Sequence, residues 1–443
     1  MPHDTALAAR IADRTAVVGV IGMGYVGLPL GLAIHGAGYK VVGFDLDIDK
    51  VDRLNAGASY IRHIPSERIS AAVSGGKFEA TVDFDRLKHC DIIIICVPTP
   101  LGKHREPDLT YVVNTSVEIA KHLQAGRLVV LESTTYPGTT TEVVRPLLDR
   151  DGLRSGSDYF LAYSPEREDP GNAEFDTVSI PKVVGGDGPE ALKIANLFYQ
   201  SVMTRTVPVS STRTAEAVKL TENIFRSVNI ALVNELKTIY TPMGIDVWEV
   251  IDAAKTKPFG FMPFYPGPGL GGHCIPIDPF YLTWKALEFD IKTRFIELAG
   301  EINTDMPGRI VTRLAEALDR TCGKGLSRST VLLVGMAYKK NVDDLRESPS
   351  LRLMEILEAR GARVAYHDPF IPSIVETREH PTLAGRRSVC AEEIGSQTYD
   401  VALIATDHDD VDYELVVRQS AVVVDTRNVL ARKNVRSDKI IKA

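Results

Sequence analysis

The chain has no surplus of basic residues, few cysteines and no apolar leader at its N-terminus. Its 51 Lys and Arg are outnumbered by 58 Asp and Glu, which gives a formal net charge of −7 and a pI near 5.9. Such a chain lacks the excess cations that neutralise a nucleic-acid backbone. Residues 1–16 alternate charged and small side chains without the apolar core of a signal peptide. We therefore predict a cytoplasmic protein that binds neither nucleic acid nor membrane.

The five cysteines are scattered and odd in number. Their spacing matches neither a disulfide framework nor paired zinc ligands, so no metal site is predicted. Cys90 and Cys96 flank an apolar run and are interpreted as inert core thiols. Cys274 differs, because it lies in a loop, Gly267–Pro279, that contains four glycines and three prolines. Glycine lets backbone and ligand approach closely, which indicates a functional thiol, and a surface loop with a chance cysteine is the alternative.

One stretch is almost free of charge. From Thr15 to Tyr39 no side chain carries a formal charge, apart from any protonated fraction of His35. That length is enough to cross a bilayer. Seven glycines and Pro29 interrupt the stretch, however, so a glycine-rich strand, turn and buried helix explains it better.

The chain of 443 residues has the length of about three domains. Apolar runs alternate with helical stretches as far as about residue 210, which predicts a doubly wound domain with a parallel sheet. The expected strands are 16–21, 41–44, 92–97, 128–131 and 160–163, and the expected helices are 25–35 and 111–123.

A helical pattern then replaces this alternation. Thr212–Tyr240 repeats apolar residues at three- and four-residue steps, which predicts a long helix with a buried stripe. The stripe consists of Ala217, Leu220, Ile224, Val228 and Ala231. Further helices are expected at 280–289 and 296–317, and this central region carries the cysteine loop.

A second α/β pattern follows the linker at 323–325. It begins with an apolar run at 331–335, and further strands are expected at 363–366, 401–405 and 422–424. Ser348 is expected to cap a helix that ends near Gly361. The predicted fold class is therefore α/β, with two Rossmann-like doubly wound parallel-sheet domains joined by a central helical domain. The expected limits are 1–210, 211–322 and 323–443.

The run Gly22-Met23-Gly24-Tyr25-Val26-Gly27 follows the first expected strand and opens the first helix. In this context the glycines make the turn, admit a pyrophosphate and pack helix on strand, so the run indicates a dinucleotide site. Asp45 ends the second strand, where it would bind the adenosine ribose and repel a 2′-phosphate. NAD is thus favoured over NADP, and a turn that serves packing alone is the alternative.

Lys219 and Asn223 lie one helical turn apart on the expected long helix, on one face with Arg226. A dehydrogenase with a loop thiol needs cationic and amide donors near a developing oxyanion. These two residues are candidates for that role, and a solvated polar face is the alternative.

Seven landmarks in this order resemble the nucleotide-sugar 6-dehydrogenases of the UDP-glucose and GDP-mannose dehydrogenase superfamily, over nearly the whole chain. They are Gly22–Gly27, Pro98-Thr99, Ser133-Thr134, Ser164–Glu166, Lys219 with Asn223, Gly271–Cys274 with Asp278, and Tyr338-Lys339 with Arg346–Ser348. The resemblance implies oxidation of a sugar C6 alcohol to a carboxylate with reduction of two NAD+. It also implies a homodimer or higher homo-oligomer formed through the central helical domain.

The resemblance implies a role for each matching residue. Cys274 would attack the intermediate aldehyde and pass through a thiohemiacetal and a thioester. Lys219 and Asn223 would stabilise oxyanions, while the general base stays open among Asp278, Thr134 and Glu166. The implied cofactor contacts are Gly22, Met23, Gly24, Tyr25, Val26, Gly27, Asp45, Lys50, Thr99, Thr134 and Arg346. The implied substrate contacts are Glu166, Arg167, Lys219, Asn223, Tyr265, Gly271, Tyr338, Lys339 and Arg427, with the UDP half on the C-terminal domain. A surface salt bridge is the alternative for each basic residue.

Two departures bear on the sugar. His273 precedes Cys274 where UDP-glucose and GDP-mannose enzymes usually have serine, and Ile277-Asp278 replaces their Lys-Asp pair. The run 166–171 also lacks the second glutamate of UDP-glucose enzymes at its usual place. Both departures resemble the branch that acts on N-acetylated sugars, above all the UDP-N-acetylglucosamine 6-dehydrogenases of surface polysaccharide or O-antigen synthesis.

Other functions stay open at this point. UDP-N-acetylmannosamine and UDP-glucose are alternative substrates. A non-catalytic NAD-binding protein is an alternative of a different class. A β-hydroxyacid or hydroxyacyl-CoA dehydrogenase shares the first-domain pattern, but it transfers one hydride and needs neither the loop cysteine nor a second nucleotide lobe.

Overall fold

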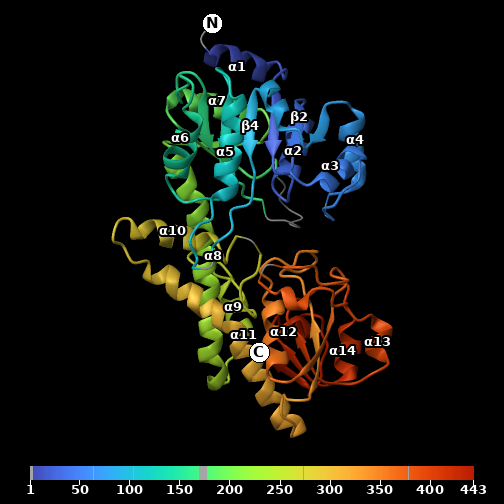
Figure 1. Ribbon diagram of the computed structural model, residues 1–443. Coiled ribbons are helices and arrows are strands. Elements are labelled where there is room, and N and C mark those ends of the chain that lie inside the picture. The colour runs from blue at the N-terminus through green and yellow to red at the C-terminus, as the bar shows by residue number, and fades with distance from the viewer. Residues whose placement is uncertain (1–2, 63, 103, 169–176, 273, 378) are drawn as a thin grey trace. The chain divides into compact units, whose positions relative to one another are not determined.

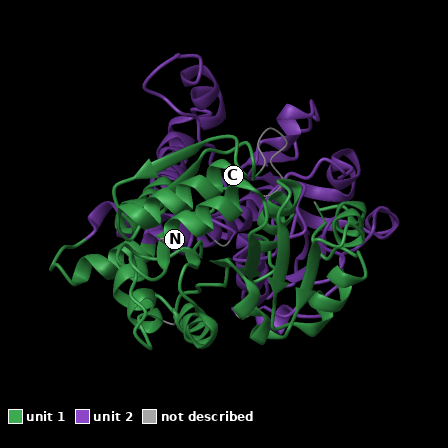
Figure 2. Cartoon of the chain, turned by 90° about the horizontal axis from the view of Figure 1, so that it is seen from above, with its two compact units in different colours: residues 1–222, 280–292 green, residues 223–279, 293–443 purple. Residues whose placement is uncertain are grey.

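The computed structural model of the chain describes residues 3–62, 64–102, 104–168, 177–272, 274–377 and 379–443. The chain divides into two compact units (Figure 2). The first unit consists of Met1–Glu222 and Phe280–Lys292, and the second of Asn223–Pro279 and Thr293–Ala443. Two helices, α8 (Thr212–Tyr240) and α10 (Asp278–Leu287), begin in one unit and continue in the other.

The first unit is built on an eight-stranded sheet with the order β3-β2-β1-β4-β5-β6-β7-β8 (Figure 1). Its neighbours pair in parallel, except that β6 and β7 are antiparallel. The order reverses at β1, between β2 and β4, and ligands of doubly wound sheets bind at such a switch point. The strands are β1 (Val17–Ile21), β2 (Lys40–Phe44), β3 (Phe78–Thr81), β4 (Ile92–Ile95), β5 (Leu128–Leu131), β6 (Phe160–Tyr163), β7 (Lys182–Gly186) and β8 (Thr206–Val209).

Both faces of this sheet are buried. Ile92 and Ile94 of β4 belong to one hydrophobic cluster, and the alternate residues Ile93 and Ile95 belong to another. A strand buried on both faces needs the continuous apolar run that this sequence provides. The helices of the unit are α1 (His3–Ala12), α2 (Gly27–Gly36), α3 (Ile48–Asn55), α4 (Ser66–Ser74), α5 (Thr110–His122), α6 (Arg145–Leu148) and α7 (Pro189–Gln200). The sequence did not predict α1, which buries Leu7 and Ile11.

The second unit contains a five-stranded parallel sheet with the order β10-β9-β11-β12-β13. The strands are β9 (Thr330–Val334), β10 (Arg363–His367), β11 (Tyr399–Ile404), β12 (Ser420–Asp425) and β13 (Ile440–Lys442). The helices that lie wholly in this unit are α9 (Val247–Ala254), α11 (Arg294–Cys322), α12 (Pro349–Ala359), α13 (Ala391–Gly395), α14 (Tyr413–Gln419) and α15 (Val429–Arg432). Ser348 caps α12 as predicted, because its side chain accepts a hydrogen bond from Ser350 N.

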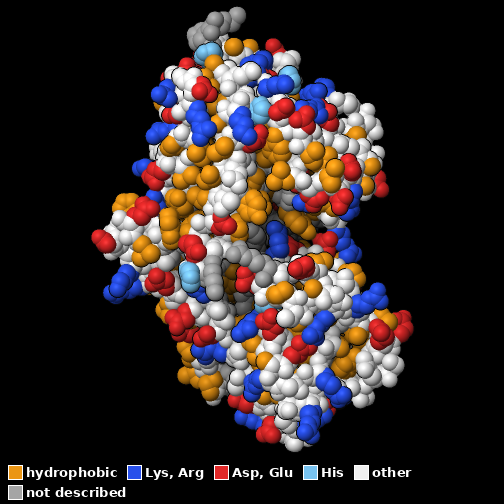
Figure 3. All heavy atoms as spheres, in the orientation of Figure 1, with side chains coloured by type: hydrophobic (Ala, Val, Ile, Leu, Met, Phe, Trp, Pro, Cys, Tyr) orange, Lys and Arg blue, Asp and Glu red, His pale blue; other side chains and the backbone are white. Residues whose placement is uncertain are grey.

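The predicted fold class is confirmed, and the predicted domain limits stay a prediction. The uncharged stretch 15–39 contains β1, a turn, the ten-residue helix α2 and the short connection that leads to β2. Among the residues that the structure describes, no helix combines the length and apolarity needed to cross a bilayer. Figure 3 shows acidic and basic side chains interleaved on the face drawn.

The buried stripe predicted for α8 is partly wrong. Leu220 and Ala231 are buried, but Ala217, Ile224 and Val228 are only half-buried. The buried positions of this helix include six polar ones, which are Thr212, Glu216, Lys219, Asn223, Ser227 and Asn234. Apolar periodicity marks the wrong face here, because hydrogen-bond partners make it possible to bury polar side chains. The alternative of a solvated polar face for Lys219 and Asn223 is therefore wrong.

Candidate active site

The turn after β1 is shaped by three glycines in the first unit. Gly22 has φ +92°, and a Cβ there would lie 2.6 Å from the carbonyl oxygen of Cys96. A Cβ on Gly27 would lie 2.0 Å from the carbonyl oxygen of Gly22, so this glycine is required for the close packing of α2. A Cβ on Gly24, in contrast, would meet no atom within 4 Å. That open backbone, next to the N-terminus of α2, fits the pyrophosphate of a dinucleotide.

Asp45 lies directly after β2, at the same switch point of the sheet. One carboxylate oxygen accepts a hydrogen bond from Met23 N at 2.9 Å, and the other accepts one from Asp47 N at 3.0 Å. Lys50 Nζ lies 3.9 Å from the carboxylate. The turn, the helix N-terminus and the carboxylate are the three parts that hold NAD in a Rossmann fold, and all three are present.

The glycine loop packs against side chains of the second unit. A Cβ on Gly271 would lie 2.6 Å from Tyr338 Cβ, and one on Gly272 would lie 2.8 Å from Tyr338 Cε2. A Cβ on Gly267 would lie 2.5 Å from Nη1 of Arg427. We expected the glycines to let a ligand approach the backbone closely, but at Gly271 and Gly272 that space is taken by Tyr338. His273, which entered the prediction of the sugar, lies outside the described residues.

Three predicted catalytic residues meet in the second unit. Asn223 Nδ2 donates to Asp278 Oδ2 at 2.6 Å, and both side chains are buried. The carbonyl oxygen of Cys274 accepts a hydrogen bond from Asp278 N at 2.8 Å, in the tight turn that leads into α10. The backbone of the loop cysteine and the side chain of Asn223 are thus both hydrogen-bonded to Asp278.

Cys90 is a buried thiol, as the sequence predicted, whereas Cys96 is only half-buried. Cys90 is buried, and burial raises its pKa to about 12. Burial and the nearby carboxylate of Glu132 raise the pKa of Cys96 as well. Both thiols therefore stay protonated and unreactive, since the thiolate is the nucleophile.

A second polar group lies in the first unit. Lys219 Nζ donates to the carbonyl oxygen of Glu166 at 2.6 Å. One carboxylate oxygen of Glu166 accepts from Lys182 Nζ at 2.8 Å, and the other accepts from the backbone N–H groups of Arg167 and Glu168, each at 2.7 Å. Lys182 also donates to Glu132 at 2.8 Å. The two glutamates therefore share one buried lysine.

The charges of this group are mutually dependent. Burial raises the pKa of Glu132. Burial opposes the charged form of Glu166 too, but Lys182 outweighs it and lowers the pKa of Glu166. Burial likewise disfavours the charged form of Lys182, and the two glutamates overcome it and raise its pKa. The sequence analysis missed Lys182 and Glu132, although a charged residue next to an apolar strand is a signal for a buried partner.

Several basic residues on the predicted ligand list are paired within their own unit. Arg167 Nη2 lies 2.5 Å from Glu222, and Arg346 Nη2 lies 2.7 Å from Asp344. Such pairs agree with the salt-bridge alternative, so the assignment of these residues to ligands stays a prediction. The roles of the other predicted ligand residues also stay predictions. Among them, the hydroxyl of Tyr265 donates to Asp252, and the carbonyl oxygen of Thr99 accepts from the hydroxyl of Tyr281. Thr134 is half-buried and follows β5.

Fold, nucleotide turn and catalytic loop together define an NAD-dependent dehydrogenase with a second nucleotide lobe. Three sequence profiles of the UDP-glucose/GDP-mannose dehydrogenase family match the chain. They are the NAD binding domain at residues 16–203, the central domain at 213–305 and the UDP binding domain at 332–432.

Individual relatives agree with these profiles. The chain is 38% identical to a UDP-N-acetyl-D-glucosamine 6-dehydrogenase of Pseudomonas aeruginosa, over 80% of this chain and 83% of that protein. It is 34% identical to a UDP-N-acetyl-D-mannosamine dehydrogenase of Pyrococcus horikoshii, over 93% of this chain and 96% of the relative.

Solved structures lead to the same family. The structure of the UDP-D-ManNAc dehydrogenase from Pyrococcus horikoshii superposes with a TM-score of 0.83 at 33% identity, covering 93% of this chain and 96% of the other. A UDP-glucose dehydrogenase from Pyrobaculum islandicum gives a TM-score of 0.83 at 27% identity, covering 96% and 97%. The chain belongs to the UDP-glucose/GDP-mannose dehydrogenase family and is an NAD-dependent UDP-sugar 6-dehydrogenase.

Proposed function

We propose that the chain oxidises the C6 hydroxyl of UDP-N-acetylglucosamine to a carboxylate, as a step in the synthesis of surface polysaccharide precursors. The reaction converts one CH2OH group and one water into a carboxylate, and it releases two hydrides and three protons. NAD, held by the turn 22–27 and Asp45, is the acceptor of both hydrides. The observation that carries the proposed chemistry is the position of Asp278, whose side chain accepts from Asn223 and whose backbone N–H donates to the carbonyl oxygen of Cys274.

Cys274 makes the second oxidation a covalent process. Its thiolate attacks the aldehyde carbon and forms a C–S bond, which gives a thiohemiacetal. Loss of a hydride from that carbon and of a proton from its hydroxyl group gives a thioester. Water then attacks the thioester, the C–S bond breaks, and the sulfur leaves as a thiolate. Covalent capture keeps the reactive aldehyde on the enzyme between the two oxidations.

Lys219 and Asn223 act as donors to the oxyanions of these steps. A buried donor that is already positioned stabilises a developing charge without reorganisation at the moment of reaction. Lys219 is held by the carbonyl oxygen of Glu166, and Asn223 is held by the carboxylate of Asp278. We propose that Asp278 orders the water and accepts its proton, and Thr134 stays a candidate for the same role.

Glu166 has a different part in this scheme. Its carboxylate is occupied by Lys182 and by two backbone N–H groups, and its pKa is lowered. A carboxylate held in this way is a weak proton acceptor. We propose that Glu166 acts mainly through its carbonyl oxygen, which positions the ammonium group of Lys219.

The UDP half belongs to the second unit in this proposal. Tyr338, packed on Gly271 and Gly272, and Lys339 lie in the segment after β9, and Arg427 follows β12. Burial lowers the pKa of the Arg427 guanidinium, which still remains charged at neutral pH. A half-buried guanidinium of this kind suits a diphosphate, because it can donate two parallel hydrogen bonds.

The sugar is tested by following NADH formation with purified UDP-N-acetylglucosamine, UDP-N-acetylmannosamine, UDP-N-acetylgalactosamine and UDP-glucose. We expect the highest kcat/KM with the first, and two NADH per sugar consumed. No turnover of UDP-N-acetylglucosamine with good turnover of another sugar would refute the choice of substrate. NAD binding without NADH formation on any of them would favour a non-catalytic protein.

We also propose that the chain assembles as a homodimer through α8. Phe225, Leu232 and Ile239 are exposed and repeat every seven residues, so they form one apolar stripe along this helix. An exposed apolar stripe of this kind is typical of a protein interface. Light scattering after size exclusion tests the proposal. The variant Leu232→Glu should shift the wild-type dimer towards monomer, and a monomeric wild type would refute it.

A further inference from the structure

The two parallel sheets place a carboxylate at equivalent positions. Asp45 follows β2, and it accepts a hydrogen bond from the turn after β1 at Met23 N. Asp368 follows β10, and it accepts from the turn after β9 at Met336 N and Ala337 N, at 2.6 and 2.8 Å. In the first unit this is the carboxylate that is expected to bind the ribose of NAD. The environment of Asp368 shows that the second carboxylate serves another purpose.

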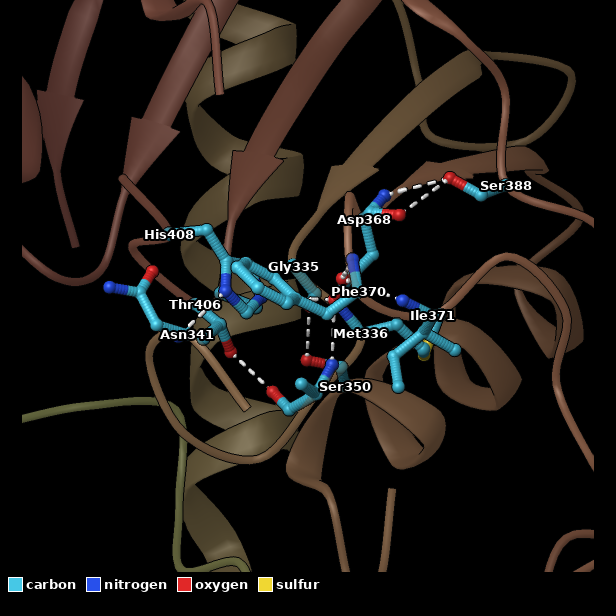
Figure 4. A network of polar contacts seen from close by, with 12 residues as sticks. Gly335, Met336, Asn341, Ser350, Asp368, Phe370, Ile371, Ser388, Thr406 and His408 are labelled. Atoms are coloured by element: carbon cyan, nitrogen blue, oxygen red, sulfur yellow. Dashed lines mark hydrogen bonds and ion pairs between the residues drawn. The ribbon is translucent and has the colours of Figure 1, made fainter. Parts of the chain in front are cut away.

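Both carboxylate oxygens of Asp368 are hydrogen-bonded to groups of the protein (Figure 4). Besides the two turn amides, its Oδ2 lies 3.0 Å from His408 Nε2, and its Oδ1 accepts from Phe370 N and Ile371 N at 2.7 and 3.0 Å. Its side chain has no exposed surface. Burial opposes its charge, but the hydrogen bond from His408 and the backbone donors lower its pKa. Asp368 is therefore an internal carboxylate that fixes the turn.

His408 connects Asp368 to the next segment of the chain. Its Nδ1 accepts a hydrogen bond from the backbone N–H of Asn341 at 2.9 Å. A backbone N–H only donates, so Nδ1 carries no proton and the neutral ring donates from Nε2 to Asp368. The ring is completely buried, and Phe370 packs against it at 4.9 Å between centroids. Both ring nitrogens are thus used, each in a fixed role.

Hydrogen bonds with Thr406 and His408 fix the two ends of a short segment, 337–341. At its start, Thr406 Oγ1 donates to the carbonyl oxygen of Ala337 at 2.6 Å. At its end, Asn341 is held by His408, and its side chain makes two hydrogen bonds with Asp409, at 2.8 and 3.0 Å. Asn341 has φ +60°, a conformation that such contacts help to maintain.

We propose that His408 is a positioning residue for the nucleotide half of the substrate, because it fixes the segment that carries Tyr338 and Lys339. This inference rests on the proposed binding of UDP by that segment. His408 does not touch the ligand in this scheme. It acts through the N–H of Asn341, and Asp368 keeps its ring in the tautomer that can accept that hydrogen bond.

Two substitutions separate the roles of the ring nitrogens. In His408→Asn the amide oxygen can take the place of Nδ1 and keep the bond from Asn341, while contact with Asp368 is lost. In His408→Gln the amide nitrogen can take the place of Nε2 and keep the bond to Asp368, while the acceptor for Asn341 is lost. Each variant loses one hydrogen bond, so a purely structural role predicts similar effects of both.

The experiment is a calorimetric titration of the full chain with UDP, and in parallel with NAD, for wild type and both variants. We expect His408→Gln to weaken UDP binding by about tenfold, as the loss of one buried hydrogen bond implies, and His408→Asn to bind within about twofold of wild type. NAD affinity should not change, and in turnover KM for the UDP-sugar should rise more than kcat falls.

Equal UDP affinities in both variants, whether both weakened or both unchanged, would overturn the inference. A wild type that binds no UDP would overturn the proposed function as well, which distinguishes the two failures. If His408→Gln does not fold, Asn341→Ala removes the bonds to Asp409 at the same end of the segment. It is expected to weaken UDP binding and leave NAD binding intact, and unchanged UDP binding would again refute the inference.

Discussion

Asn223 donates its side-chain amide to the carboxylate of Asp278 across 2.6 Å, and neither side chain is exposed to water. This bond orients the amide, and it offsets part of the free-energy cost of burying the carboxylate of Asp278. In the proposed chemistry both groups are also catalytic, so stability and activity depend on the same contact.

The variant Asn223→Asp tests this contact. It places two carboxylates in hydrogen-bond distance, so one must bind a proton, and the loss of stability should be largest at high pH and smaller as pH falls. The double variant Asn223→Asp with Asp278→Asn restores a donor and an acceptor in reversed order. We expect it to recover Tm but not turnover, and recovery of turnover would show that the carboxylate at 278 is dispensable.

Cys274→Ser should lower turnover at least about a hundredfold, because a hydroxyl is a much weaker nucleophile at neutral pH than a thiolate. Intact-mass analysis during turnover should reveal an accumulated acyl adduct on the serine or no adduct at all. Cys322→Ser is the matched control, since Cys322 is an exposed thiol outside both polar groups. Full activity of Cys274→Ser would refute covalent catalysis.

Lys182→Met should destabilise the first unit by about 3–5 kcal/mol, because it leaves Glu132 and Glu166 buried without their cation. Thermal unfolding measures this loss, and it should be smaller at low pH, where the carboxylates are protonated. Lys193→Met is the control, because that lysine is largely exposed and its ion pair with Asp4 lies at the surface. Similar Tm values for both variants would contradict a structural role for the buried group.

Glu216 provides a stability test with a defined pH range. It is buried and accepts hydrogen bonds from Gly138 N and from the N–H and hydroxyl of Thr140, yet burial outweighs these and raises its pKa to about 7. The folded state therefore holds this proton more tightly than the unfolded state, with its ordinary pKa near 4.5. The stabilisation is complete below pH 4.5 and is lost as pH rises to about 7.

The variant Glu216→Gln should remove this pH dependence, which amounts to about 3 kcal/mol between the two limits. The measurement is the difference in Tm between wild type and variant from pH 4.5 to 8, with the exposed Glu190→Gln as control. A difference that stays constant across the range would show that Glu216 does not titrate there.

Asp45→Asn tests the choice of cofactor. The carboxylate is expected to bind the ribose hydroxyls and repel a 2′-phosphate, so the variant should lose kcat/KM with NAD by about tenfold and gain relative activity with NADP. Asp85→Asn is a control on an exposed aspartate of the same unit. An unchanged ratio of NAD to NADP activity would remove Asp45 from the site.

The sequence predicted those parts of the fold and site whose geometry is local. Gly22 and Asp45 follow directly after strands, so the alternation of apolar runs and turns was enough to place them. Lys182 and His408 were missed, because their partners Glu132 and Asp368 are 50 and 40 residues away in the chain. No periodicity within one element reveals such a pair, and only the packed sheet brings it together.

The polar burial on α8 shows the same limit. The apolar residues Ile224 and Val228 suggested one face, whereas Asn223 and Ser227 turn out to be buried. Hydropathy ranks side chains by their own solvation, and it contains no information on a carboxylate contributed by another segment.

The occupied carboxylate of Asp368 has a consequence for steady-state kinetics. The second parallel sheet is of the same type as the NAD-binding sheet, but its carboxylate at Asp368 is not available to a ribose. Both oxygens of that carboxylate are already hydrogen-bonded within the protein. An excess of NAD should therefore not compete with the UDP-sugar. Rates measured against rising NAD should reach a plateau without a later decline, and each ligand should saturate its own lobe.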